Sequence, residues 1–340
     1  MIWFYIATIL PATMLGLASV WGDPFAGLAL LSVTIFAYLM DKVGGELPAN
    51  ERSGRVLSVI LALIHFPLLL LGVWSLAKPD HLSLLDKVLL FNAFGLYLGQ
   101  ISNSNAHELI HARHKALHKL GTYVYISLLH GHHVSAHLRV HHIFVATDAD
   151  PNSARKGEGF WRYLIRAWPA EFAAGLKAET NHRARLRTPL TRLSHPYTLY
   201  LVGAGAALVA SFAVAGPFGI LAHLMIASYA QIQLFLSDYV QHYGLRRLSR
   251  KGKTEPTGPQ HSWNAPHWYS SAMLLNAPHH SDHHQNPGRE FTKLQIDDAS
   301  MPMLPYSLPM MAVIALLPGL WRKLMDPRVA HWQSKASNAY

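Results

Sequence analysis

Residues 86–111 read DKVLLFNAFGLYLGQISNSNAHELIH, an apolar run that ends in two histidines four positions apart. The run is long enough to cross a bilayer as a helix, which takes about 20 predominantly apolar residues. Residues four apart lie on one face of a helix, so His107 and His111 can reach the same metal ion. The stretch therefore predicts a membrane span with a metal-binding motif at one end.

The whole chain has the composition of a membrane protein. Of its 340 residues, 51% are hydrophobic and only 14% are charged, against about 25% charged in an average soluble domain. Turn and helix-breaking residues at 22–24, 44–48, 78–80 and 216–217 separate apolar runs. Six such runs lie near 2–21, 25–41, 56–77, 86–106, 197–215 and 217–240. We predict an all-α integral membrane protein, built as a six-helix transmembrane bundle.

The positive charge indicates how the chain is oriented. The formal net charge is +10, and basic residues concentrate at 113–192 and 246–253. Such residues mark the cytoplasmic side and attract anionic lipid, so we predict no nucleic-acid partner. Each basic stretch follows an even number of spans, so we expect both termini in the cytoplasm. The expected order is transmembrane helices 1–4 at 1–106, a cytoplasmic segment at 107–196, transmembrane helices 5–6 at 197–240, and a second cytoplasmic segment at 241–340.

The two cytoplasmic segments are expected to form a helical, histidine-rich cap. In the first, Pro169 should break a helix. In the second, the apolar run at 303–321 is interrupted by Pro305, Pro309 and Pro318. We therefore expect this run to be an interfacial or re-entrant segment and not a seventh span.

Three histidine motifs carry the chemistry among the 23 histidines of the chain. The second motif, His137–His142, repeats the four-residue spacing with His141 and adds the next residue. The third contains His280, His283 and His284. Together with the first motif they supply eight imidazoles, more than the about four to six ligands that one metal ion takes. They suit two metal ions with open positions, and ligand type alone does not choose among Zn, Cu, Fe and Ni.

These motifs resemble those of the membrane alkane monooxygenases (alkane 1-monooxygenases), relatives of the xylene monooxygenases and fatty-acid desaturases. The most similar stretches are HELIH at 107–111, HLRVHH at 137–142, YVQHYG at 239–244 and HSDHHQNP at 280–287. Residues 145–155 and 320–328 add to the resemblance, which runs from about 107 to 328. It implies a nine-histidine di-iron site. Its ligands would be His107, His111, His137, His141, His142, His242, His280, His283 and His284, of which His242 comes from the resemblance alone.

The resemblance also implies a reaction. With two iron ions and O₂, such an enzyme hydroxylates an unactivated C–H bond, here the terminal carbon of an alkane or a similar hydrophobic molecule drawn from membrane lipid. The chain has no Cys for an iron–sulfur cluster and no GxGxxG motif for a dinucleotide. A rubredoxin or ferredoxin with an NAD(P)H reductase is therefore implied as the electron donor. We expect the active site on the cytoplasmic side of a bacterial inner membrane. An acidic carrier would dock on the basic surface of Arg246, Arg247, Arg250 and Lys251.

Residues beside the motifs depart from the family's pattern and leave the product open. Ala112 stands where the family usually has Lys, Ala136 and Gln241 replace Glu, and Val140 replaces Gly. Hydroxylation of an aromatic methyl group or a terpene, or desaturation of a fatty-acyl chain, would use the same site. A zinc-protease interpretation of HELIH leaves the other two motifs unexplained. A metal transporter would place ionisable residues deep within its spans, where this chain has few.

Several further side chains are candidates for supporting roles. Glu108, Asp238 and Asp282 neighbour predicted ligands, and our hypothesis is that the two aspartates accept imidazole N–H groups. The histidines around the first two motifs are predicted to be supporting or interfacial groups: His114, His118, His130, His132 and His133. Lone histidines near spans are predicted to contact headgroups: His65, His81, His195, His223 and His331. His261, His267 and His279 also lie outside the predicted ligand set.

Overall fold

The computed structural model describes residues 1–45, 47, 52–78, 80–186, 191–250 and 252–338. Lys251 of the predicted docking surface lies outside the described residues, as do parts of the predicted breaks at 44–48 and 78–80.

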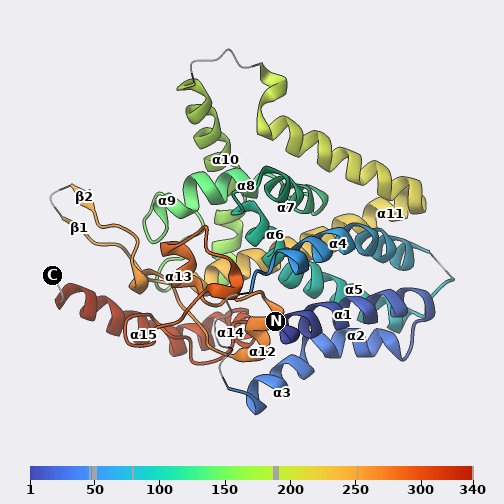
Figure 1. Ribbon diagram of the computed structural model, residues 1–340, viewed down its shortest axis with the longest axis horizontal. Helices are drawn as coiled ribbons and strands as arrows, with labels where there is room; N and C mark the ends of the chain where they lie inside the picture. The colour runs from blue at the N-terminus through green and yellow to red at the C-terminus, as the bar shows by residue number, and fades with distance from the viewer. Residues whose placement is uncertain (46, 48–51, 79, 187–190, 251, 339–340) are drawn as a thin grey trace.

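The described chain is mainly helical (Figure 1). Up to the first histidine motif the helices are α1 (Ile2–Trp21), α2 (Phe25–Val33), α3 (Ile35–Val43), α4 (Arg55–Ala77), α5 (Leu84–Leu96), the π-helix η1 (Tyr97–Ser102) and α6 (Asn103–Ile110). Then come α7 (Lys115–Ser127), α8 (His133–Ala136), the π-helix η2 (His137–His141), α9 (His142–Phe144), α10 (Phe160–Ala184), the 3₁₀-helix η3 (Arg192–Ser194) and α11 (Pro196–His242). The remainder holds the 3₁₀-helix η4 (Pro259–His261), α12 (Trp268–Met273), α13 (His280–Gln285), the 3₁₀-helix η5 (Phe291–Lys293), α14 (Leu308–Ala315) and α15 (Pro318–Asn338). A small antiparallel hairpin of β1 (Ser249–Arg250) and β2 (Lys253–Thr254) departs from the all-α prediction.

Among the described residues, four helices are long and apolar enough to cross a membrane, or five if the bent pair α2–α3 forms one span. The four are Ile2–Trp21, Arg55–Ala77, Leu84–Ile110 and Pro196–His242. The run near 25–41, predicted as one span, is bent by 45° where α2 meets α3. Thr34 lies at this bend, and its hydroxyl donates to the Leu30 carbonyl at 2.6 Å. Such a bond competes with the helical backbone bonds and favours bending.

The helix α11 consists of two arms that fold back on each other. Ala215 and Gly216 have non-helical backbone angles, and Gly216 takes a φ of 60° that favours glycine. Ser211 Oγ on the first arm lies 2.6 Å from His223 Nδ1 on the second. Figure 1 shows the arms meeting at an acute turn, so the predicted break at 216–217 is confirmed.

The segments around the histidine motifs pack onto the helix ends. Trp321 on α15 lies fully buried against Tyr239 and Tyr243 at the end of α11. The expected break at Pro169 was wrong, because α10 continues through this residue. A proline removes one backbone hydrogen bond, and the helix is held by its packing on α8 and α11. The run at 303–321 is divided between α14 and α15, and α14 is too short to span a bilayer.

Candidate metal centre

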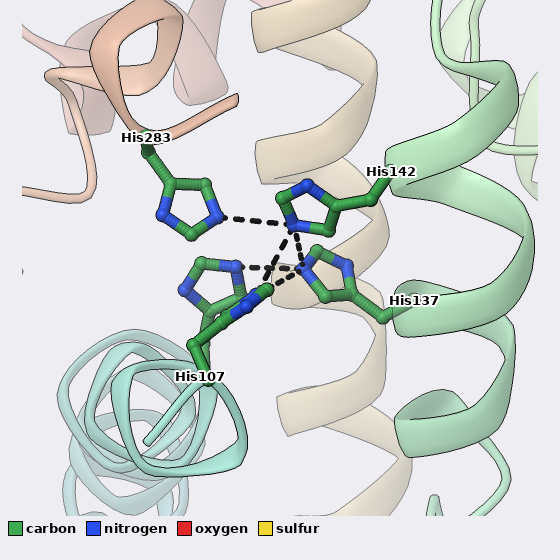
Figure 2. A group of neighbouring side chains, drawn as sticks. His107, His137, His142 and His283 are labelled. Carbon is green, nitrogen blue, oxygen red and sulfur yellow. Dashed lines mark hydrogen bonds between the residues drawn. The ribbon is translucent and has the colours of Figure 1, made fainter. Parts of the chain in front are cut away.

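All nine histidines of the predicted ligand set gather in two groups. Within each group the nearest ring nitrogens lie within 4.8 Å of one another. The five-histidine group contains His107, His111, His137, His142 and His283, and the four-histidine group contains His141, His242, His280 and His284. In Figure 2 the labelled rings of His107, His137, His142 and His283 converge from three separate segments of the chain. The spacing within the three histidine motifs did not identify His242 as a ligand; the family resemblance did.

The distances between ring nitrogens fit a shared metal ion. Neighbouring Nε2 atoms are 2.9–3.2 Å apart in the five-histidine group and 2.9–3.1 Å apart in the four-histidine group. An imidazole nitrogen lies about 2.1 Å from a bound first-row metal, so two nitrogens at right angles lie about 3.0 Å apart, against about 3.4 Å in a tetrahedron. The observed spacing therefore fits a metal ion with five or six positions better than a tetrahedral structural zinc.

The pairing of ligands differs from the one that α-helical spacing predicts. Four-residue spacing pairs His137 with His141, but His137 joins His142 and leaves His141 to the other group. The cause is local: residues 137–141 form the π-helix η2, whose bonds join residues five apart. In the first motif, by contrast, His107 and His111 share a group as spacing predicts.

The third motif also serves both groups. His280 and His284, four residues apart on α13, belong to the four-histidine group, whereas His283 belongs to the five-histidine group. The second and third motifs therefore each contribute to both groups. This arrangement fixes the two groups beside each other.

Burial lowers the pKa of imidazoles in the two groups and so favours the neutral form that binds a metal ion. Burial, together with neighbouring histidines, lowers the pKa of His111 and of His280 to about 3. Both rings are therefore neutral near pH 7 and keep a lone pair for a metal ion. For His141, burial opposes the charged form, but the carboxylate of Asp150 outweighs it and raises the pKa.

Asp150 is a supporting residue that the sequence prediction missed. Its Oδ2 lies 2.9 Å from His141 Nδ1 and accepts a hydrogen bond from the Ser153 hydroxyl at 2.7 Å. A carboxylate on one ring nitrogen fixes the tautomer and leaves the other nitrogen to the metal. Asp150 lies in the stretch 145–155 that carries part of the family resemblance, but its spacing from His141 has no helical signature.

The carboxylates predicted for that role have other described partners. Asp238 accepts a bond from the Asn152 side chain at 2.8 Å. Asp282 is held by Arg289, and also accepts from Asn286 and from the backbone of residue 295. Glu108 accepts from the Phe291 amide and lines a cavity of about 340 Å³ beside His111. The three side chains therefore contact the loops around the site. Asp150, and neither of the two predicted aspartates, lies at hydrogen-bond distance from the N–H side of a ligand imidazole.

Two of the five lone histidines, His65 and His223, do not make the headgroup contacts that we predicted. His65 and His223 are 1% and 0% exposed, and both bind Ser127, at 2.8 and 2.7 Å. They join helices inside the bundle. His118 binds the Ile110 carbonyl at 2.7 Å, immediately after the first motif.

Buried histidine groups at the ends of apolar helices define a membrane-bound, histidine-ligated metalloenzyme. The model of the family described as fatty acid desaturase matches residues 83–313. The chain belongs to this family, and within it to the alkane 1-monooxygenases. Alkane 1-monooxygenase of Ectopseudomonas oleovorans is 28% identical over 96% of this chain and 85% of its own length. Alkane 1-monooxygenase 2 of Pseudomonas aeruginosa is 30% identical, over 84% and 76%.

A more distant relative is the xylene/toluene monooxygenase hydroxylase component of Pseudomonas putida, 23% identical over 68% of this chain and 61% of its own length. The protein is thus an integral-membrane non-haem iron monooxygenase. Its family membership implies a hydrophobic substrate and an external electron-transfer partner.

Proposed function

We propose that this protein hydroxylates the terminal carbon of an alkane or a similar hydrocarbon, and that its nine histidines hold two iron ions. The main support for this proposal is that the predicted ligands converge into groups of five and four histidines, in a chain related to alkane 1-monooxygenases. When bound, the iron pair would supply the oxidation of an unactivated C–H bond by O₂. The protein would hold the ions, keep ligands such as His111 and His280 neutral, and exclude water.

An apolar cavity of about 360 Å³ is the proposed entrance for the substrate. It lies between α3, α5, α11 and α14, and Leu96, Tyr229 and Met310 are among its lining residues. A smaller cavity shares Gln100 and Gln233 with it and reaches Asn103 and Ser104, one helical turn before His107. An apolar chain entering from lipid would therefore approach the five-histidine group along α6.

The proposed electron donor is a rubredoxin or ferredoxin, reduced by an NAD(P)H reductase. Its proposed dock is the basic surface of Arg246, Arg247, Arg250 and Lys251. In the described part of this surface, Arg246 is paired with Asp148 at 3.6 Å, and Arg247 donates to the Glu255 and Ile143 carbonyls. Reversing the four charges should raise the carrier concentration needed for half-maximal turnover and flatten its salt dependence. Unchanged values would place the dock elsewhere.

The proposed topology has six spans, with both termini and the metal centre on the cytoplasmic side. The two arms of α11 would be spans five and six, and α2–α3 would be the second. The cytoplasmic segments would be 107–196 and 241–340, as the distribution of Lys and Arg favours. The helix that carries His107 continues through Ile110, so the first motif would lie at the membrane boundary.

Metal content and product analysis test the function together. We expect at least two irons per chain in the purified protein after anaerobic reconstitution, and a primary alcohol from octane, O₂ and a reductase–rubredoxin pair. His283→Ala should lower both the iron content and the alcohol yield, whereas His331→Ala, an exposed histidine outside both groups, should change neither. A His283→Ala protein with full iron content would contradict the ligand assignment.

Hydroxylation of an aromatic methyl group is the second candidate, because a xylene/toluene monooxygenase component is among the relatives. The same assay with xylene separates the two. Benzylic alcohol from xylene, with no alcohol from octane, would favour the second candidate. A terpene alcohol or an unsaturated acyl chain would instead indicate the other outcomes that the histidine motifs leave open.

A further inference from the structure

Three buried side chains outside the two histidine groups meet between α8 and α10. His130 lies in the turn after α7, His133 begins α8, and Glu171 lies on α10. Their exposed fractions are 1%, 2% and 1%. A carboxylate is costly to bury unless it is paired or bound to a metal ion. The arrangement around Glu171 therefore needs an explanation of its own.

The polar atoms of these residues lie close together, and several have no hydrogen-bond partner. One ligand atom from each residue lies within 4.8 Å of the other two, the limit that the two histidine groups also meet. His133 Nδ1 is 2.6 Å from Glu171 Oε1. His130 Nε2 is 3.3 Å from Oε2, but the two do not have hydrogen-bond geometry. Both ring nitrogens of His130 and Oε2 of Glu171 are buried without a hydrogen-bond partner among the described residues.

We propose that His130, His133 and Glu171 bind a third divalent transition-metal ion, separate from the nine-histidine centre. Two imidazoles and one carboxylate form the ligand set of catalytic zinc sites and of non-haem ferrous sites. A bound ion would supply the partner that His130 and Glu171 lack. His132 offers a further metal ligand, since its ring centroid lies 4.4 Å from that of His130 and its Nε2 is buried without a hydrogen-bond partner.

A cluster of protonated histidines around Glu171, without metal, is the competing explanation. It accounts for His133, whose Nδ1 meets the carboxylate at hydrogen-bond distance. It accounts less well for His130, because an imidazolium would carry two buried N–H groups, of which only Nε2 lies near an acceptor, at 3.3 Å from Oε2 of Glu171. A metal ion bound at Nε2 would take the lone pair of that nitrogen and leave one buried N–H, at Nδ1, where an imidazolium has two, so the contacts of His130 favour the metal.

The third ion would connect α10 to the segment that carries the second histidine motif. His133 lies one turn before His137, and their ring centroids are 5.1 Å apart. On the other side, α10 supplies Glu171 as a ligand of the proposed ion. An ion bound here would therefore hold the start of η2 against α10 and steady His137, without being a ligand group of the nine-histidine centre.

The test counts metal in the full-length protein, purified in detergent and reconstituted anaerobically with iron or with zinc. Glu171→Gln preserves shape and removes the charged ligand, and we expect it to hold one equivalent less than the wild type. Glu179→Gln is the matched control, a buried carboxylate on the same helix that binds Arg139 and Ser135 and belongs to none of the three groups. It should keep the wild-type count. Element-specific X-ray absorption tells whether zinc or iron occupies the site.

Equal metal counts in the wild type and in Glu171→Gln would overturn the proposal and leave the protonated cluster as the explanation. If Glu171→Gln does not fold, His130→Asn makes the same comparison. Anomalous density between the three side chains in wild-type crystals would support the site without any variant, and its absence from metal-loaded crystals would contradict it. Because the readout is a difference of one equivalent, it does not depend on the substrate or on full loading of the nine-histidine centre.

Discussion

Asp150 contacts the ring nitrogen of His141 that faces away from the other ligands of its group. Asp150→Asn keeps the size of the side chain but removes its charge, so we expect affinity for the metal to fall by about 10–100-fold. Competition against a calibrated chelator measures this affinity. Asp298→Asn, at an exposed position, is the control. Equal affinities for Asp150→Asn and the wild type would mean that the carboxylate does not orient His141.

Glu158 is held by charged and backbone donors beside the turn that carries Asp150. Burial alone would raise its pKa, but hydrogen bonds and charge from Arg166 and Arg155 lower it below the ordinary value. Its folded-state pKa therefore lies below its unfolded-state pKa. The stabilisation is complete above the unfolded value, about 4.3, and is lost as the pH falls through the folded value.

Glu158→Gln should consequently lower the free energy of unfolding near pH 7 by about 1.5 kcal/mol, the low end for a charged hydrogen bond because Arg166 is partly exposed. The difference from the wild type should shrink as the pH falls below about 4.3. Thermal unfolding in detergent across this pH range provides the measurement. A difference that stays constant with pH would show that the charge of Glu158 contributes nothing.

At the scale of the elements, the turn in α11 depends on Gly216. Its φ of 60° and ψ of −150° fall in a region essentially restricted to glycine. Gly216→Ala should destabilise the protein by about 1–3 kcal/mol. Gly205→Ala, on the same helix with open space around it, should be neutral or stabilising by up to about 1 kcal/mol. Equal midpoints of thermal unfolding for the two variants would contradict this account of the turn.

Motifs and hydropathy predicted the apolar helices, the break at 216–217 and eight of the nine converging histidines, because each has a local pattern; His242 came from the family resemblance. Three features had no such pattern. The π-helix η2 redistributes His141 and His142 between the groups, since a spacing rule assumes α-helical bonds. The bend at Thr34 lies within an apolar run that has no proline or glycine at that point to mark it. The contact of Asp150 with His141 depends on an irregular turn.

At the scale of the whole molecule, the surface of α11 agrees with a membrane location. Leu201, Val202, Val209 and Phe212 on its first arm are each more than half exposed. Apolar side chains that contact no other part of a soluble protein would be a liability, whereas lipid covers them at no cost. The arm therefore belongs at the edge of the bundle.

The absence of Cys allows a direct test of orientation. In the proposed topology Asp80 lies outside the cytoplasm and Asp298 inside, and both are exposed. In intact spheroplasts, a membrane-impermeant maleimide should label Asp80→Cys, whereas Asp298→Cys should react only after the membrane is broken. Iron content serves as the check that both variants fold. The reverse labelling pattern would invert the topology.

The short helix α13 completes both histidine groups, and it lies late in the chain. During synthesis, a ribosome exposes four ligands of the first group and two of the second before residues 280–284 appear. If the two groups hold iron as proposed, neither set of ligands is complete until the polypeptide is nearly finished, and a chain that ended before α13 would lack ligands from both.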